Sequence, residues 1–143
     1  MARIPFNVSA KTARLIGREN VSNLEGALIE LIKNTYDADA KKCVVYYESS
    51  TDRLFIIDNG IGMNKDVIIN NWMTIGNSTK KESVFTKSGR VNTGEKGIGR
   101  FALDRISEKC TMLTVSKDER FEWLVNWESF DSNSFLAHSL KKS

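Results

Sequence analysis

Apolar and polar residues follow each other with helical spacing in the first third of the chain, and they predict a helix from about Ser22 to Ala40. The apolar positions are three and four residues apart, which is the period of a helix with one buried side. They are Leu24, Ala27, Leu28, Leu31 and Ile32. Ser22 and Glu25 have the spacing of a capping box, which predicts that the helix begins there. We therefore expect one face of this helix to pack into the domain core.

Runs rich in β-branched and aromatic residues predict four strands, over residues 43–48, 53–58, 110–116 and 121–127. The polar segment 49–52 separates the first two runs and predicts a hairpin between them. The chain therefore combines helices with strands.

Three shorter helices are also predicted, from Ser9 to Arg18, from Asn64 to about Trp72 and from Gly99 to about Ser107. Residues 75–97 hold many Gly, Ser, Thr and Lys but no periodic apolar pattern, so we expect a long loop there. Loops of this length in compact domains are usually functional lids or disordered segments. No clear element is predicted after Phe130.

The composition is typical of one soluble globular domain over residues 1–143, long enough to bury a core. Apolar residues make up 41% of the chain and charged residues 27%. The net charge of +3 is too small to indicate nucleic acid, which is left open as a partner. No apolar run is long enough to span a membrane, and the first residues lack the apolar region of a signal peptide. We therefore expect a cytoplasmic protein without a membrane partner.

The two cysteines, Cys43 and Cys110, each begin an apolar run and match no metal-ligand spacing. We expect both to be buried free thiols, as in a reducing cytosol.

A stripe of polar residues lies beside the apolar side of the first long helix. Glu30, Asn34 and Asp37 occupy positions i, i+4 and i+7, which places their side chains along one side of a helix. Such a stripe is either an ordinary solvated face or part of a functional site, and the helix alone does not decide between them.

A glycine-containing turn follows the strand predicted over residues 53–58. Asp58 ends that strand and leads into Asn-Gly60-Ile-Gly62-Met63. Glycine at both positions allows positive φ and the close approach of a flat ligand, and the Asp58 carboxylate can accept a hydrogen bond from a ligand amine. The alternative is a plain Asp-Asn-Gly turn. A calcium-binding EF-hand loop does not fit, because its alternating oxygen ligands are missing.

A second glycine-rich segment, Gly94-Glu-Lys-Gly97-Ile98-Gly99, leads directly into a predicted helix. A turn of this kind at a helix N-terminus presents free N–H groups and the positive end of the helix dipole, which suits phosphate. It does not match a Walker A loop, because Glu95 follows where Lys is needed. It also does not match the dinucleotide-binding fingerprint, which needs a different glycine order after a first strand.

These three motifs, in this order, resemble those of the GHKL ATPase superfamily, which includes gyrase B, heat-shock chaperones, histidine kinases and MutL. The segment Glu-Leu-Ile-Lys-Asn-Thr-Tyr-Asp-Ala-Asp-Ala resembles the family's N-box, Asp-Asn-Gly-Ile-Gly-Met its adenine-binding box, and Gly-Glu-Lys-Gly-Ile-Gly its phosphate box at the end of a lid. The resemblance covers roughly residues 20–117. It implies an α+β fold, a two-layer sandwich of the Bergerat type. In that fold, helices cover one face of a mixed, mostly antiparallel sheet.

The resemblance also implies an ATP and Mg²⁺ site and a role for each matching residue. Glu30 would be the general base that takes a proton from the attacking water, and Asn34 would hold the Mg²⁺ that bridges the phosphates. Asp37 would support the site from the same helix face, and Asp58 would accept from the adenine amine. The other implied nucleotide contacts are Gly60, Gly62 and Met63 at the adenine, Gly94, Gly97, Ile98 and Gly99 at the phosphates, and Lys80, Lys96 and Arg100 as candidate cations.

Within this superfamily the residues favour hydrolysis of ATP over phosphate transfer to protein. Histidine kinases usually carry Asn where this chain has Glu30, and the single histidine, His138, is near the end of the chain. A histidine-kinase catalytic domain and a non-catalytic nucleotide-sensing module are the alternatives.

The chain departs from the superfamily pattern near its end. The Gly-Thr strand that usually completes the sheet is not found before Ser143, and neither is a second domain that offers Lys or Arg to the terminal phosphate. We therefore expect the front part of a longer protein, C-terminally incomplete. Its expected partners are ATP or ADP, a downstream domain of the same protein, and a second copy in an ATP-dependent homodimer.

Overall fold

The computed structural model describes residues 15, 19, 23–72, 84–93, 101–130 and 141–142. In chain order its elements are α2 (Leu24–Asp37), β1 (Cys43–Glu48), β2 (Arg53–Asp58), α3 (Lys65–Val67) with a π-helical continuation (Ile68–Trp72), α4 (Ala102–Ile106), β3 (Lys109–Val115), β4 (Arg120–Asn126), a 3₁₀ turn (Trp127–Phe130) and β5 (Lys141–Lys142).

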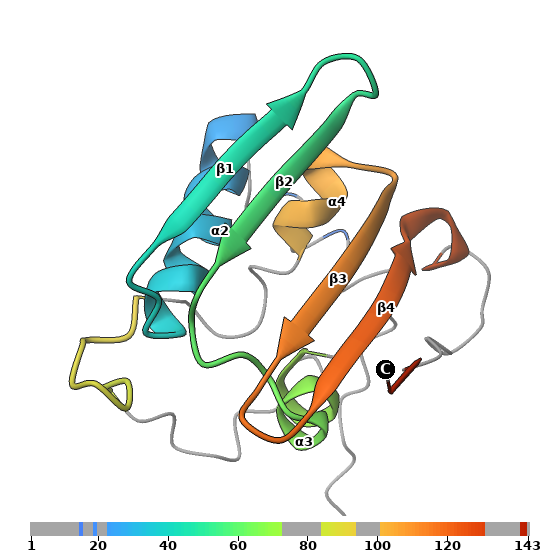
Figure 1. The fold of residues 1–143 in the computed structure, drawn as a ribbon. Coiled ribbons are helices and arrows are strands. Elements are labelled where there is room, and N and C mark those ends of the chain that lie inside the picture. The colour runs from blue at the N-terminus through green and yellow to red at the C-terminus, as the bar shows by residue number, and fades with distance from the viewer. Residues whose placement is uncertain are drawn as a thin grey trace, which may run out of the picture.

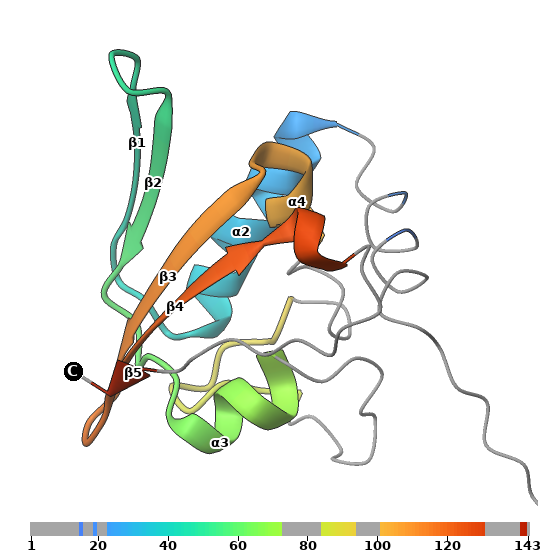
Figure 2. The ribbon, with the colours of Figure 1, turned by 90° about the vertical axis from the view of Figure 1, so that its right-hand side faces the viewer.

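Two antiparallel sheets form one layer of the molecule. β1 pairs with β2, with Cys43 opposite Asp58, and β4 pairs with both β3 and β5. Figure 1 shows the β1–β2 and β3–β4 hairpins side by side, and Figure 2 shows α2 and α4 on the same side of both. This arrangement of helices on one face of antiparallel strands confirms the predicted α+β class.

Four strands, β1 to β4, were predicted almost to the residue, whereas β5 lies where no clear element was predicted. β1 and β2 have the predicted bounds, whereas β3 and β4 each begin and end one residue earlier than predicted. The predicted turn joins β1 to β2. In that turn Asp52 takes a left-handed φ of 52°, and its carboxylate accepts from the Tyr47 hydroxyl at 2.8 Å.

The start of α2 differs from the predicted capping box. Asn23 is the N-cap, and its side-chain oxygen accepts from the Gly26 N–H at 2.8 Å. The N-cap is therefore one residue later than predicted, and the Asn23 side chain satisfies a free N–H group of the first turn. The helix ends at Asp37, and the N–H of the next residue, Ala38, donates to the Asn34 carbonyl at 3.0 Å.

The buried side of α2 is narrower than the apolar pattern predicted. Its buried residues are Ala27, Leu31 and Thr35, spaced four residues apart, whereas Leu24 is 54% exposed and Ile32 is 42% exposed. Thr35 is buried, but its hydroxyl is hydrogen-bonded, because it donates to the Ile32 carbonyl at 2.8 Å.

Two apolar clusters form the core, and Leu103 of α4 packs against both. The smaller cluster joins α2 to α4 and β2 through Ala27, Leu31, Ala102 and the partly buried Ile56 and Ile106. The larger one consists of Ile68, Phe101, Phe121, Trp123, Val125 and Trp127. The inner face of β4 therefore packs against the helical layer that carries the polar stripe of α2.

Other predictions on the helices and thiols are met in part. Asn64 caps α3 as predicted, accepting from the Val67 N–H at 2.9 Å. The helix predicted from Gly99 to Ser107 is present over Ala102–Ile106, and the one predicted from Ser9 to Arg18 lies outside the described residues except for Leu15, which is helical. Both cysteines are free.

The prediction of two buried thiols is wrong for one of them. Cys43 is exposed, because it opens β1, whose residues up to Tyr47 are all exposed. Cys110 is half-buried, and this burial raises its pKa to about 11. Among the described helices none is long and apolar enough to cross a membrane.

Candidate active site

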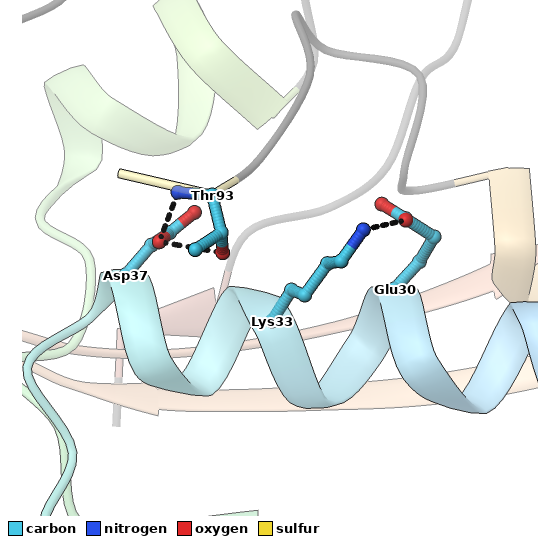
Figure 3. Close-up of polar contacts among 4 residues, drawn as sticks. All are labelled: Glu30, Lys33, Asp37 and Thr93. Atoms are coloured by element: carbon cyan, nitrogen blue, oxygen red, sulfur yellow. Dashed lines mark hydrogen bonds and ion pairs between the residues drawn. The ribbon is translucent and has the colours of Figure 1, made fainter. Parts of the chain in front are cut away.

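One side of α2 carries the polar residues predicted from the sequence and also Lys33, which was not predicted. Figure 3 shows the side chains of Glu30, Lys33 and Asp37 projecting from the same side of the helix. The Lys33 ammonium donates to the Glu30 carboxylate at 2.8 Å, with 41% and 27% of the two side chains exposed. Asn34, one turn after Glu30, is exposed. Sequence reasoning missed Lys33, although its place three residues after Glu30 was visible.

Asp37 binds the residue that directly precedes the predicted phosphate box. Its Oδ1 accepts from the Thr93 N–H at 2.8 Å and from the Thr93 hydroxyl at 3.0 Å (Figure 3). The last turn of α2 is thereby tied to the start of the glycine-rich segment at Gly94. Thr93 was not foreseen, and its only signal in the sequence is its position next to that segment.

Residues 84–93, which lie within the long loop predicted from the sequence, form a small hairpin. Phe85 and Val91 make an antiparallel bridge, the Thr86 N–H donates to the Arg90 carbonyl at 2.8 Å, and Gly89 takes a φ of 84°. These ten residues contain no named helix or strand, so they are a loop as predicted, and turn hydrogen bonds give this loop a defined shape. Turn-type hydrogen bonds, instead of an apolar repeat, hold the segment together.

The residues just beyond α2 hold this hairpin in place. The Asp39 carboxylate accepts from the hydroxyls of Thr86 and Ser88 and, at 3.0 Å, from the Ser88 N–H. The hydrogen bonds from Ser88 and Thr86 hold the pKa of Asp39 below its ordinary value. Asp39 itself takes a left-handed φ of 58°.

Arg90 supplies the positive charge at the C-terminal end of α2. The last turn of this helix has no basic residue of its own. The Arg90 guanidinium lies 4.9 Å from the centre of the Tyr36 ring and donates to the carbonyls of Tyr36 at 3.3 Å and Ala40 at 2.9 Å. A cation there complements the helix dipole, and its two hydrogen bonds go to one carbonyl in the last turn of α2 and one just beyond it.

The predicted adenine box folds back against the same end of α2. Asp58 is exposed at the end of β2, and its Oδ1 accepts from the Gly60 N–H at 2.8 Å. The Ile61 N–H donates to the Ala38 carbonyl at 2.9 Å. Asn59 fixes the turn from within, because its Oδ1 accepts from two backbone N–H groups, those of Lys41 and Lys42. The turn that begins at Asp58 is thus hydrogen-bonded to the residue that follows α2, the helix that carries Glu30.

The two glycines of this box are required for different reasons. Gly62 has a left-handed φ of 67°, and a Cβ there would lie 2.0 Å from the Val115 carbonyl oxygen. Gly60 does not take a positive φ, so that expectation is wrong for it. A Cβ at Gly60 would lie 2.6 Å from the Ala38 carbonyl oxygen, and close approach of the backbone explains this glycine.

Met63 ends the box on the inner face of the sheet. Its N–H donates to the Thr114 hydroxyl oxygen at 2.8 Å, and its partly buried side chain packs against the larger core cluster. Thr114 was missed by the sequence analysis. The available signal was a hydroxyl residue on the side of β3 that otherwise carries Cys110 and Met112.

The remaining site predictions cannot be placed. Lys80, Gly94, Lys96, Gly97, Ile98, Gly99 and Arg100 lie outside the described residues. The described part of the chain contains no cluster of three or more His, Cys, Asp or Glu that could hold a metal ion. An amide oxygen such as that of Asn34 fits Mg²⁺, which takes few protein ligands and completes its shell with water and phosphate oxygens.

Comparison with known proteins decides the family. Residues 21–142 match the model of the histidine kinase-, DNA gyrase B- and HSP90-like ATPases. The chain belongs to this ATPase family. The family assignment confirms the GHKL resemblance, and it supports ATP binding and hydrolysis as the activity at a coarse level.

Several curated proteins are similar to the chain over most of its length. The chaperone protein HtpG of Nitrosomonas europaea is 28% identical over 85% of the chain, and HtpG of Wigglesworthia glossinidia brevipalpis is 31% identical over 85%. A candidate type II restriction enzyme, HgiDII of Herpetosiphon aurantiacus, is 35% identical over 68%. The chain spans 22%, 23% and 16% of the lengths of these relatives, less than a quarter of each.

Proposed function

We propose that this ATPase-family domain binds ATP together with Mg²⁺ and hydrolyses it at the polar face of α2. The observation that carries the proposal is the hydrogen bond of 2.9 Å between the Ile61 N–H and the Ala38 carbonyl. It attaches the turn that begins at Asp58 to the residue that follows α2. We therefore assign recognition of the base to the turn at Asp58 and the chemistry to α2, and this hydrogen bond connects the two.

Asp58 is the group proposed to recognise the base. Its carboxylate is exposed, ends a strand and is oriented by the Gly60 N–H, which donates to Oδ1 at 2.8 Å. A carboxylate accepts hydrogen bonds only, so it suits the exocyclic amine of adenine and opposes the carbonyl that guanine carries at the same place. The proposed discrimination between ATP and GTP follows from this chemistry.

Glu30 is the proposed general base. A water held beside its carboxylate gives up a proton to Glu30 while the water oxygen forms a bond to the terminal phosphorus. The bond from that phosphorus to the bridging oxygen breaks, and ADP leaves with this oxygen. When bound, Mg²⁺ would neutralise the charge of the phosphates, and Asn34 is the residue proposed to hold it.

The hairpin of residues 84–93 is proposed to be the fixed base of a lid. It is held by Asp39 and by Arg90, and Thr93 at its end is bound to Asp37. Contacts of ATP phosphates with the following glycine-rich segment would then be transmitted to α2. We further propose that lid closure or dimerisation driven by the nucleotide controls a larger machine.

The test is release of phosphate from ATP by the purified full-length protein, with and without Mg²⁺, beside a measurement of label transferred from the terminal phosphate to protein. Phosphate release that needs Mg²⁺ and leaves the protein unlabelled is the expected result. Labelled protein would replace the proposal with the histidine-kinase alternative. ATP binding with neither outcome would favour a nucleotide-sensing module.

Replacing the base separates chemistry from binding in the same assay. Glu30→Ala is expected to lower the hydrolysis rate by about 10²–10⁴-fold, the usual contribution of a positioned base, with ATP affinity near that of the wild type. Glu25→Ala is the matched control, because Glu25 is exposed in the first turn of the same helix. Hydrolysis by Glu30→Ala at the wild-type rate would refute the assignment of the base.

A further inference from the structure

The hydroxyl of Thr114 is hydrogen-bonded to the last residue of the proposed adenine box, Met63. Thr114 is 7% exposed on the inner face of β3, opposite Phe121 of β4. Its oxygen accepts from the Met63 N–H at 2.8 Å, across 51 positions of sequence. A buried hydroxyl among apolar neighbours is costly unless it is hydrogen-bonded, so this contact explains why a threonine can occupy the position.

β3 approaches the box at two successive residues. Beside the hydrogen bond from Met63 to Thr114, the Val115 carbonyl lies so close to Gly62 that a Cβ there would be 2.0 Å from its oxygen. On its other side the box is bound to the end of α2 through Ala38. The turn is therefore clamped between the end of a helix and the end of a strand.

We propose that Thr114 is a positioning residue for the nucleotide. By fixing the backbone at Gly62 and Met63, it determines where the adenine ring packs against the turn. It thereby also determines the distance from the ring to Asp58. This inference rests on the proposed function, because it assigns a task within the same site. Thr114 touches none of the reacting atoms, so its loss changes binding of the base and leaves the chemical step alone.

An ordinary stabilising hydrogen bond has a different experimental signature. Loss of a bond that only stabilises the fold lowers the melting temperature and the active fraction, and it affects all nucleotides equally. Loss of a positioning bond reduces affinity most for the nucleotide whose base is registered against Asp58. The preference for ATP over GTP is therefore the measurement that separates the two roles.

The experiment compares Thr114→Val, which keeps the shape and loses the acceptor, with Thr114→Ser, which keeps the acceptor. The matched control is Thr111→Val, on the exposed outer face of the same strand. Calorimetry with ATP and with GTP, steady-state phosphate release and thermal melting are measured on the full-length protein. Should Thr114→Val not fold, Thr114→Cys takes its place, since a thiol is a weak acceptor of similar size.

We expect Thr114→Val to weaken ATP binding about tenfold, as an unsatisfied buried N–H would, with a smaller loss for GTP and with kcat unchanged. Thr114→Ser and Thr111→Val should bind ATP within about twofold of the wild type. Equal losses for ATP and GTP, or no loss, would overturn the positioning role. Failure of the wild type to bind ATP would instead refute the proposed function.

Discussion

The Glu30 carboxylate and the Lys33 ammonium lie 2.8 Å apart, one turn of α2 from each other (Figure 3). Both groups are partly exposed, and ion pairs of this kind add little to stability, typically about 0–1 kcal/mol. The significance of the pair is therefore local. It fixes the carboxylate that we propose as the general base on the face of α2 where Asn34 and Asp37 also lie.

Removing the Lys33 charge should reduce turnover without unfolding the protein. Lys33→Met keeps the aliphatic stem but leaves the Glu30 carboxylate without this donor. We expect kcat to fall by about tenfold, because a misplaced base loses part of its usual contribution, while the melting temperature stays close to that of the wild type. Steady-state phosphate release and thermal melting measure the two quantities. Lys33→Arg should restore most of the rate, and an unchanged kcat in Lys33→Met would reduce the pair to a surface ion pair.

Breaking the contact between Asp37 and Thr93 should weaken binding of the phosphates. Asp37→Ala removes an acceptor of two hydrogen bonds, at 2.8 and 3.0 Å, that holds the residue before Gly94. Hydrogen bonds to a charged group contribute about 1.5–3 kcal/mol, so the affinity for ATP should fall by about tenfold or more.

Limited trypsin digestion provides the second measurement for this prediction. Freed from Asp37, the hairpin of residues 84–93 should be cut sooner, with Lys87 and Arg90 as the cleavage sites. Asp66→Ala is the control, because Asp66 is exposed on α3 and away from this contact. Digestion and ATP affinity equal to those of the wild type would show that the remaining contacts of Asp39 and Arg90 suffice.

The fold was largely predictable, because its strands and helices depend on local patterns. β1 and β2 follow from two β-rich runs around a polar turn, and their bounds are as predicted. The N-cap of α2 was not predicted correctly, because serine and asparagine, at positions 22 and 23, are both residue types that cap helices well. The choice depends on which oxygen reaches the Gly26 N–H in three dimensions.

Which residues of the candidate site lie together was predictable only for residues on the same helix or in the same turn. Glu30, Asn34 and Asp37 share a face because of helical spacing. By contrast, Asp37 meets Thr93 across 56 positions and Met63 meets Thr114 across 51. Such contacts are set by tertiary packing, and no local pattern contains them. The sequence therefore indicated the boxes but not the residues that hold them in place.

The two thiols should react very differently with alkylating agents. Only the thiolate is nucleophilic, and burial raises the pKa of Cys110 to about 11 from its ordinary 9.0. In a Cys43→Ser variant, where Cys110 is the remaining thiol, alkylation at pH 8 should be roughly a hundredfold slower than in the same chain unfolded in urea. Mass spectrometry against time gives the rates, and equal rates would contradict burial of this thiol.

The same shift predicts how stability depends on alkaline pH. The folded pKa of Cys110 lies above the unfolded one, so its contribution to stability is fully present below pH 9.0 and is lost as the pH rises toward about 11. Urea unfolding of the wild type should therefore show a decline over this interval that a Cys110→Ala variant lacks. A decline of the same size in both proteins would assign it to other groups.

Asp58→Asn should weaken nucleotide binding more than any other single change at the site. The amide has the same shape as the carboxylate, but it is neutral and can turn its own N–H₂ donor toward the adenine amine. Since hydrogen bonds to charged groups contribute about 1.5–3 kcal/mol, the affinity for ATP should fall by about ten- to a hundredfold or more. Calorimetry with ATP and GTP measures it, with Asp52→Asn at the tip of the β1–β2 hairpin as the control. GTP binding should not weaken and should improve, because the amide removes the opposition between the carboxylate and the guanine carbonyl and can donate to that carbonyl. The Gly60 N–H can still donate to the amide oxygen, so the turn itself should persist. A loss of affinity would therefore report on recognition of the base. Unchanged affinity for ATP would leave Asp58 with the role of a turn residue alone.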